Sequence, residues 1–220
     1  MTKSGYIPKT WQKLKICDIA QISSGGTPSR KEMSFWNGTI PWITTGEVNF
    51  NRIKISKESI SELGLKNSAA KIFPKGTILI ALYGQGKTRG KVGILETPAT
   101  TNQACAALIT GSTVSSEFLF QYLMHNYLNL RKLSNTGSQE NLNSDLIKSF
   151  FVLIPPLPEQ RKIAQILSTW DKAIALTEQL IVAKEQRKRG LMQQLLLGKR
   201  GFLVGSMRLI LDGGKVLPRE

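Results

Sequence analysis

The apolar positions of the chain change their spacing twice, and these changes divide it into parts. Through about the first hundred residues, short apolar runs alternate with turns rich in glycine and serine, as in TIPWITTGEV, GTILIALYG and KVGIL. Apolar runs of this length between turn residues predict β-strands. From Ser115 the spacing becomes helical, and after residue 156 it becomes a heptad. The pattern predicts an α+β protein with a mixed α/β globular domain followed by a long C-terminal helix.

Helices are expected at several places inside the domain, among them a possible short helix begun by Asp18 and a capped short helix within NTGSQENLNSDLIKSF. SKESISELGLKN predicts a short helix that begins at Ser59 or Ser61 and ends at Gly64. SSEFLFQYLMHNYLNLRKL predicts one buried helix that Ser115 caps, because its apolar residues recur at helical spacing. The run FFVLIPP then predicts a buried strand, and the globular domain is expected to close with it, at residue 156.

The long helix is expected to run from Pro158 to Leu197, within a segment bounded at 157–200, and to be about 60 Å long. Its apolar residues form a heptad seam, with Thr177, Lys184 and Lys188 at the intervening seam positions. One compact domain cannot cover such a helix, so a coiled coil with a partner helix is favoured over a helix folded back on the core. The seam residues are Ile163, Leu167, Trp170, Ile174, Ile181, Leu191 and Leu195. In the last segment, 201–220, two apolar runs flank an Asp-Gly-Gly turn and predict a small hairpin.

Charge indicates the kind of partner. The 220 residues include 30 Lys and Arg against 15 Asp and Glu, so the formal net charge is +15, and the excess is spread along the chain. A charge of this size favours nucleic acid, with a membrane surface second. No apolar run reaches the roughly 20 residues needed to span a bilayer, and the first residues do not read as a signal peptide. We therefore expect a cytoplasmic protein without a membrane partner.

The stretch LIALYGQGKTRGK resembles a nucleotide-binding loop but fails its pattern. With Gly86, Lys87 and Thr88 in place, the first glycine of that motif falls on Ala81. The residues after Gly90 suit a second strand better than the helix that a phosphate loop requires. The lysines and arginines of this loop still predict contact with an anion.

The chemistry expected of an enzyme is not found in the sequence. The acidic residues are scattered, His125 is the single histidine, and Cys17 and Cys105 form no metal motif, so the sequence predicts no catalytic or metal site. The single Pro-Pro pair lacks the polar and aromatic neighbours of an amino-methyltransferase motif. We expect no cofactor in this chain.

Five loops instead carry residues suited to DNA. Lysine, arginine and threonine commonly hold phosphates, whereas glutamine and asparagine can bond base edges. The candidate DNA-binding residues are Thr27, Ser29, Arg30, Lys31, Thr44, Thr45, Tyr83, Gln85, Lys87, Thr88, Arg89, Lys91, Asn102, Gln103, Ser138 and Gln139. Solvated turns have a similar composition, so each loop is weak alone and the five together favour nucleic acid.

Several segments together resemble the specificity subunit of type I restriction-modification enzymes. They are GGTPS, IPWITTGEVN, GLKNSAAKIFPKGTILIALYGQGKTRGKVGIL, ATTNQACAAL, TGSQENLNSDLI and IPPLPEQRKIAQILSTWDKAI, and the resemblance runs from about Ile7 to Arg200. It implies a DNA target recognition domain over 1–156, a helical region over 157–200 for dimerisation and methyltransferase docking, and a short tail over 201–220. It also implies that the chain is not itself an enzyme.

Complete members of that family resemble two tandem copies of this unit, and here we find one copy and no internal repeat. The resemblance implies a half subunit that reads one half of a bipartite site on double-stranded DNA and pairs as a homodimer through its helix. It also implies modification and restriction subunits as partners, which would bring S-adenosylmethionine, ATP and Mg. The alternative is a free-standing dimeric DNA-binding regulator without a methyltransferase partner.

Overall fold

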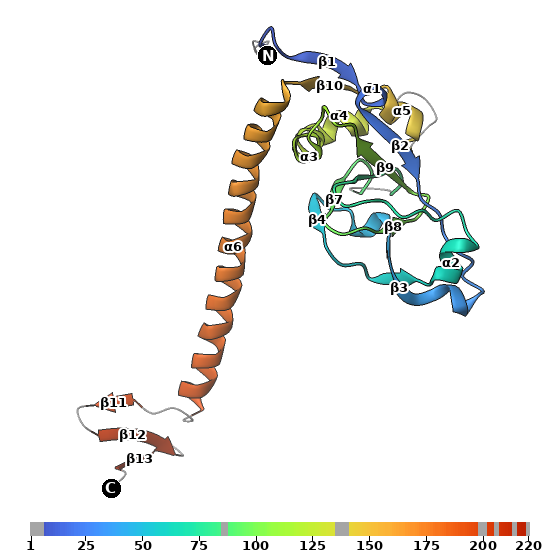
Figure 1. Ribbon diagram of the computed structural model, residues 1–220. Helices are drawn as coiled ribbons and strands as arrows, with labels where there is room; N and C mark the ends of the chain where they lie inside the picture. Colours follow the sequence, from blue (N-terminus) through green and yellow to red (C-terminus); the bar gives the residue numbers. More distant parts are fainter. Residues whose placement is uncertain are drawn as a thin grey trace. The chain divides into compact units, whose positions relative to one another are not determined.

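The computed structural model describes residues 7–84, 88–134 and 141–197, with the backbone of three strands between 202 and 218 (Figure 1). The chain forms two compact units, Met1–Ile166 and Leu167–Glu220. In the described part of the first unit the strands form three sheets, and helices lie around them. This agrees with the α+β class that the apolar pattern predicts.

The largest sheet has five strands in the order β2-β9-β6-β7-β4, and all neighbours are antiparallel except β7 and β4. Its central strand carries the continuous apolar run Ile-Leu-Ile-Ala, because both faces of the sheet are covered. Ile78 and Ile80 face one core, and Leu79 and Ala81 face the other. The strands are β2 Ala20–Ser24, β9 Cys105–Thr110, β6 Ile78–Ala81, β7 Val92–Leu95 and β4 Asn51–Ile53.

A second sheet has the order β5-β3-β8, with bounds Glu58–Ile60, Trp36–Ile43 and Thr100–Thr101. Strands β3 and β8 are parallel, whereas β3 and β5 are antiparallel and shift register between Trp36 and Ile40. A small core of Ile40, Trp42 and Ile60 lies against this sheet. Two short 3-10 helices flank β3, namely η1 Met33–Phe35 and η2 Thr45–Glu47.

The helices of the first unit mostly follow the sequence predictions. Helix α2, Glu62–Lys66, begins after Ser61 as expected, but it continues past Gly64, which is buried inside it. The expected single helix after Ser115 is two helices, because Asn126 leaves the helical conformation and its amide donates to the Tyr122 carbonyl. The helices beside the large core are α1 Ile16–Ile19, α3 Ser116–His125, α4 Tyr127–Lys132 and α5 Ser144–Lys148.

The first unit closes where β10, Phe151–Ile154, pairs antiparallel with β1, Gln12–Lys15, beside the start of α6 (Figure 1). Helix α6 runs without a break from Leu157 to Leu196, within one residue of the predicted bounds and through Gly190. Its first turns are fastened to the domain, since Gln160 and Ala164 are buried. The first unit therefore extends into α6 and ends at Ile166.

The tail beyond α6 contains the predicted hairpin. Strands β12, Met207–Asp212, and β13, Lys215–Pro218, pair antiparallel, as a hairpin requires. A further strand, β11 Phe202–Val204, pairs with β12 and was not expected from the sequence.

Candidate nucleic-acid interface

Strand register brings the predicted DNA-binding loops to one end of the large sheet. Ser24 at the end of β2 lies opposite Ala106, and Ala81 at the end of β6 lies opposite Cys105, the first residue of β9. The segment after β2, the segment after β6 and the turn before β9 therefore leave the sheet at the same end. These segments contain Thr27, Tyr83 and Gln103.

The second sheet and the parallel pair β4–β7 bring further segments to the same end. Because Ile43 is level with Thr101 in the parallel pair β3–β8, residues 44 and 102 leave their strands together, and the Asn102 amide donates to the Ile43 carbonyl at 3.0 Å. The Leu142 amide donates to the Leu82 carbonyl at 3.1 Å, which ties the segment after residue 140 to the end of β6. Gly93 in β7 is level with Asn51 in β4, so residues 49 and 91 precede their strands at this end.

Tight contacts join the segment after β2 to the end of β8 and to the turn that follows it. The Gly26 amide donates to the Thr101 carbonyl at 2.8 Å, and a Cβ at Gly25 would meet that same oxygen at 1.8 Å. Only glycine fits so close to another backbone. The Thr27 hydroxyl donates to the Gln103 side chain, so two candidate residues from separate loops are already in contact.

Lys91 lies in a polar and aromatic setting. Its Nζ donates to Asn49 Oδ1 at 2.6 Å and lies 5.7 Å from the centre of the Phe50 ring. The Phe50 ring packs edge-on against Tyr127 of α4 at 4.9 Å. The cation is therefore held at the loop end of β7, with an amide beside it that can bond a base.

Arg30 already has partners within the domain. Its guanidinium makes two hydrogen bonds to the Glu58 carboxylate and lies 3.7 Å from the centre of the Trp36 ring. The hydrogen bond to Glu58 raises the pKa of Arg30 and lowers the pKa of Glu58. Arg30 thus connects residues 29–31 to β5 and β3, while Lys31 beside it is exposed.

The remaining candidate DNA-binding residues differ in exposure and in whether their side chains already have a hydrogen-bond partner. The Thr44 hydroxyl donates to Glu47 at 2.9 Å in a capping box, whereas Thr45 begins η2. Tyr83 is exposed, and Thr88 and Arg89 are half-buried in the turn before β7. Ser29 is exposed and Asn102 is half-buried. Gln85, Lys87, Ser138 and Gln139 lie outside the described residues.

The described residues of the turn before β7 do not have the conformation of a nucleotide-binding phosphate loop. Gly90 has φ +82° and is followed by strand β7, not by a helix. A phosphate loop of the nucleotide-binding kind requires a helix at that point, so the sequence prediction of a second strand is confirmed.

Two further basic residues lie near this surface and are not among the residues predicted from the sequence to bind DNA. Arg131 of α4 donates to the Tyr127 hydroxyl at 2.7 Å, and its side chain packs 3.1 Å from a Cβ built on Gly90. Its signal in the sequence is weak, because an arginine at the end of an amphipathic helix usually indicates a solvated face. Lys71 donates to the Ser23 hydroxyl at 3.2 Å, at the edge of the same sheet.

Arg52, which shares the asparagine-rich segment after β3, has a structural role. Its guanidinium bonds the Glu117 carboxylate at 2.6 and 2.9 Å and Glu96 at 3.2 Å. These carboxylates raise its pKa, with the Glu117 hydrogen bond as the largest cause. Arg52 therefore joins β4 to α3, and its guanidinium is engaged by carboxylates of the domain itself.

Helix α6 presents most of its predicted seam to solvent. Ile163 packs partly on the large core of the first unit, so the uncovered seam begins at Leu167. Trp170, Ile174 and Ile181 are each more than half exposed, and Leu191 and Leu195 are partly exposed. An apolar row of this length without cover is typical of a surface that binds a partner.

The described residues offer neither a metal centre nor a membrane helix. No group of three or more His, Cys, Asp or Glu side chains is gathered among them. Within the same ranges, no helix combines the length and the apolar character needed to cross a bilayer. The chemistry at the loop end is that of hydrogen bonding and positive charge.

Comparison with known proteins agrees with this geometry. Residues 8–185 match the family model described as the type I restriction modification DNA specificity domain. The chain belongs to this family. The specificity domain is 36% identical over 178 residues to the type I restriction enzyme MjaIX specificity subunit of Methanocaldococcus jannaschii, a match that covers 79% of this chain and 40% of that protein.

Solved structures share the fold of the specificity domain. A chain from a structure of the type I R-M system, described for complex assembly and conformational transition, superposes with a TM-score of 0.66 at 18% identity, covering 89% of this chain and 47% of that one. The HsdS subunit from Thermoanaerobacter tengcongensis gives 0.61 at 17%, covering 82% and 42%. This chain therefore spans about half the length of these relatives.

Proposed function

We propose that this specificity domain reads one half of a bipartite DNA site and directs the adenine methylation and restriction carried out by partner subunits. The observation that carries the proposal is the convergence of loops rich in Lys, Thr, Asn and Gln at one end of the sheet, in a chain of net charge +15. DNA phosphates attract a positively charged surface whatever the base sequence of the DNA. The amide side chains on this surface can then select particular bases. The chain itself carries out no catalysis.

Each class of side chain has a distinct role in this proposal. Lys31, Lys91 and Arg89 hold phosphates. Gln103 and Asn102 read base edges, because an amide can both donate and accept in the major groove. The candidates outside the described residues keep the roles expected from the sequence, with Lys87 on the backbone and Gln85 and Gln139 near bases.

Helix α6 pairs with the α6 of a second copy in the antiparallel direction. Lys184 and Lys188 occupy seam positions, so a parallel pair would place each lysine against its own copy inside the interface. In the antiparallel pair the lysines face the apolar half around Trp170 and Ile174. A two-fold homodimer presents two identical recognition domains, and its target is a palindrome with an unread spacer.

The paired helices also dock modification subunits, and a restriction subunit joins them, all in the cytoplasm. Those partners bring S-adenosylmethionine, ATP and Mg, and this chain supplies sequence recognition. The relatives are named specificity subunits of type I restriction enzymes, which supports this division of labour.

Selection of bound sequences from random double-stranded DNA tests the proposal. The expected result is two inverted half-sites at a fixed separation. Recovery of one contiguous or asymmetric site would contradict it. Copurification with the modification subunit distinguishes it from a free-standing regulator, which would bind DNA as a dimer and retain no such partner.

A further inference from the structure

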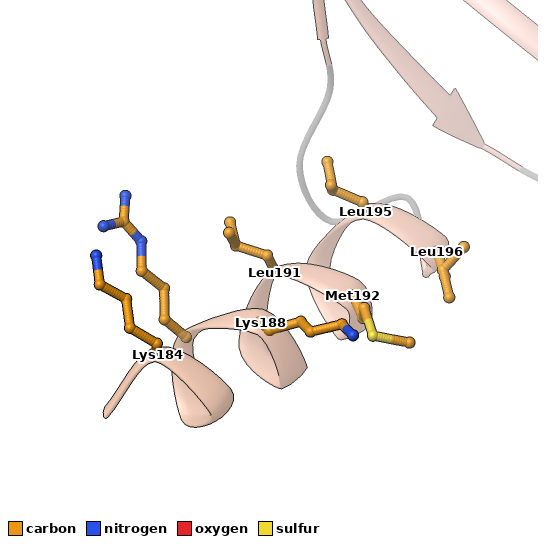
Figure 2. Close-up of a pocket in the computed structure, with 7 residues that line it drawn as sticks. Lys184, Lys188, Leu191, Met192, Leu195 and Leu196 are labelled. Carbon is orange, nitrogen blue, oxygen red and sulfur yellow. The ribbon is translucent and has the colours of Figure 1, made fainter. Parts of the chain in front are cut away.

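The C-terminal third of α6 carries an open hollow that the DNA-binding role does not use. It is lined by Lys184, Arg187, Lys188, Leu191, Met192, Leu195 and Leu196. Figure 2 shows Leu191 and Leu195 projecting from the same side of the helix, with the two labelled lysines in the preceding turns. The surface is apolar at one end and positively charged at the other.

Another part of the same helix has the complementary character. Trp170 is 66% exposed, the largest side chain on the uncovered seam, and Asp171 and Glu178 lie near it in the sequence. Between Leu167 and Leu180 the helix has two acids and one lysine, whereas between Ile181 and Leu197 it has four basic residues and one acid. The two halves of α6 are complementary in charge and both are apolar along the seam.

We propose that Trp170 of a second copy of this chain occupies the hollow and fixes the register of the α6 pair. The uncovered seam runs from Leu167 to Leu195, so its midpoint is Ile181. With the two-fold axis there, Trp170, eleven residues before the midpoint, lies opposite Met192, eleven residues after it. This inference rests on the proposed homodimer and adds its anchor and its register.

The chemistry of the hollow suits an indole. Leu191, Met192 and Leu195 supply apolar and polarisable contacts for the ring. The ammonium of Lys188 or Lys184 can lie over its face, an interaction that is strongest for tryptophan. The two-fold symmetry forms this contact twice in each dimer. Exposed tryptophans that enter a partner's pocket are typical anchors of protein interfaces.

Dimer dissociation constants from sedimentation test the anchor. Trp170→Ala is expected to raise the constant at least about 100-fold, since each dimer loses two anchors worth at least about tenfold each. Leu176→Ala, an exposed apolar residue off the seam, is expected to leave it within about twofold. Lys188→Glu raises it, whereas the same charge reversal at the adjacent Arg189 does not. The inference would be overturned if Trp170→Ala and Leu176→Ala had the same dissociation constant, or if the Lys188 and Arg189 variants did.

Disulfide trapping in a Cys17→Ser background tests the register. Ile181→Cys lies near the axis and is expected to cross-link to its own copy. Leu195→Cys is expected not to, because the two copies of residue 195 are about 42 Å apart in the antiparallel pair. A cross-link at 195 would indicate a parallel pair and overturn the inference. If the protein were a monomer at every concentration, the homodimer of the proposed function would be refuted as well. If it formed a dimer whose dissociation constant did not change in Trp170→Ala, only the anchor would be refuted.

Discussion

The Thr27 hydroxyl donates a hydrogen bond to the side-chain oxygen of Gln103, 76 positions further along the chain. Thr27 follows β2 and Gln103 precedes β9, so this bond joins two loops that register places together. Neither loop alone is distinctive in the sequence. The pair gives the candidate interface a defined internal geometry that substitution can test.

Removing this bond is expected to reduce sequence discrimination more than stability. Thr27→Val should lower the ratio of target to random-DNA affinity by about tenfold, because the Gln103 amide, which we propose reads a base edge, loses its orientation. The melting temperature should change little, since both side chains are exposed. Thr27→Ser keeps the hydroxyl and serves as the control. Binding titrations on both DNAs measure the ratio, and equal losses for valine and serine would contradict this role.

Lys91 is expected to contribute a phosphate contact. Lys91→Met should weaken binding to target and random DNA alike and reduce the slope of log affinity against log salt by about 1. Lys75→Met is the matched control, because Lys75 precedes β6 at the opposite end of the sheet. A salt titration for each variant gives the slopes. Equal slopes for the two variants would remove Lys91 from the interface.

The Arg30–Glu58 pair predicts a small dependence of stability on pH. The pKa of Glu58 in the folded state is lowered from 4.5 by its hydrogen bonds to Arg30. Its contribution is therefore complete above that ordinary value and is lost as the pH falls through the lower folded-state pKa. Both side chains are partly exposed, so solvent screens the pair to less than about 1 kcal/mol.

Glu58→Gln should accordingly lower the free energy of unfolding at pH 7 and have a shrinking effect below pH 4. Urea unfolding at both pH values measures this difference. Glu62→Gln, at an exposed acid on the neighbouring helix α2, controls for the general loss of one negative charge. A Glu58→Gln effect that grows on acidification would contradict the assigned ion pair.

Gln160 fastens the first turns of α6 to the domain. Its side chain accepts from the Ser115 amide at 2.8 Å and donates to the carbonyls of Thr113 and Pro155 at 3.2 and 2.8 Å. Gln160→Leu leaves these buried groups unsatisfied and should lower the free energy of unfolding by at least about 2 kcal/mol. Gln193→Leu, the same change at an exposed position of α6, should stay within about 0.5 kcal/mol. Chemical denaturation compares the two.

The two cysteines should differ in reactivity. Cys105 is buried, and burial raises the pKa of its thiol to about 12, so the reactive thiolate is scarce at pH 8. Cys17 is exposed. Mass spectrometry after iodoacetamide treatment should find Cys17 modified in the folded protein and both thiols modified in urea. Modification of native Cys105 at a similar rate would mean that β9 opens readily.

The sequence predicts local structure better than it predicts the interface. The run through Ile78–Ala81, the cap at Ser115 and the length of α6 follow from periodicity and capping, which act over a few residues. The sequence pattern does not predict the break at Asn126, because the apolar spacing continues across it. Such a break depends on whether a side chain, here the Asn126 amide, hydrogen-bonds a nearby backbone carbonyl.

Contacts between residues far apart in the sequence determine which of the candidate residues share the interface. Arg30 and Arg52 have the same composition signal as a phosphate-binding arginine, yet Glu58 and Glu117 hold them in ion pairs that sequence spacing does not disclose. The convergence of the loops depends on the parallel pairs β3–β8 and β4–β7, whose partners are remote in sequence. Residue type indicated the chemistry, and the strand order determined which residues share a surface.

The strand ends at the loop edge have a consequence for how this protein can diversify. Four of the five candidate loops begin or end at a strand whose register is fixed within the buried sheets, by pairs such as Ala81 with Cys105 and Ile43 with Thr101. A loop can therefore lengthen, shorten or change its side chains without altering which strand faces enter the cores. Helix α6, which we propose pairs with a second copy, is a separate segment. New DNA targets could thus evolve by loop replacement while assembly is inherited unchanged.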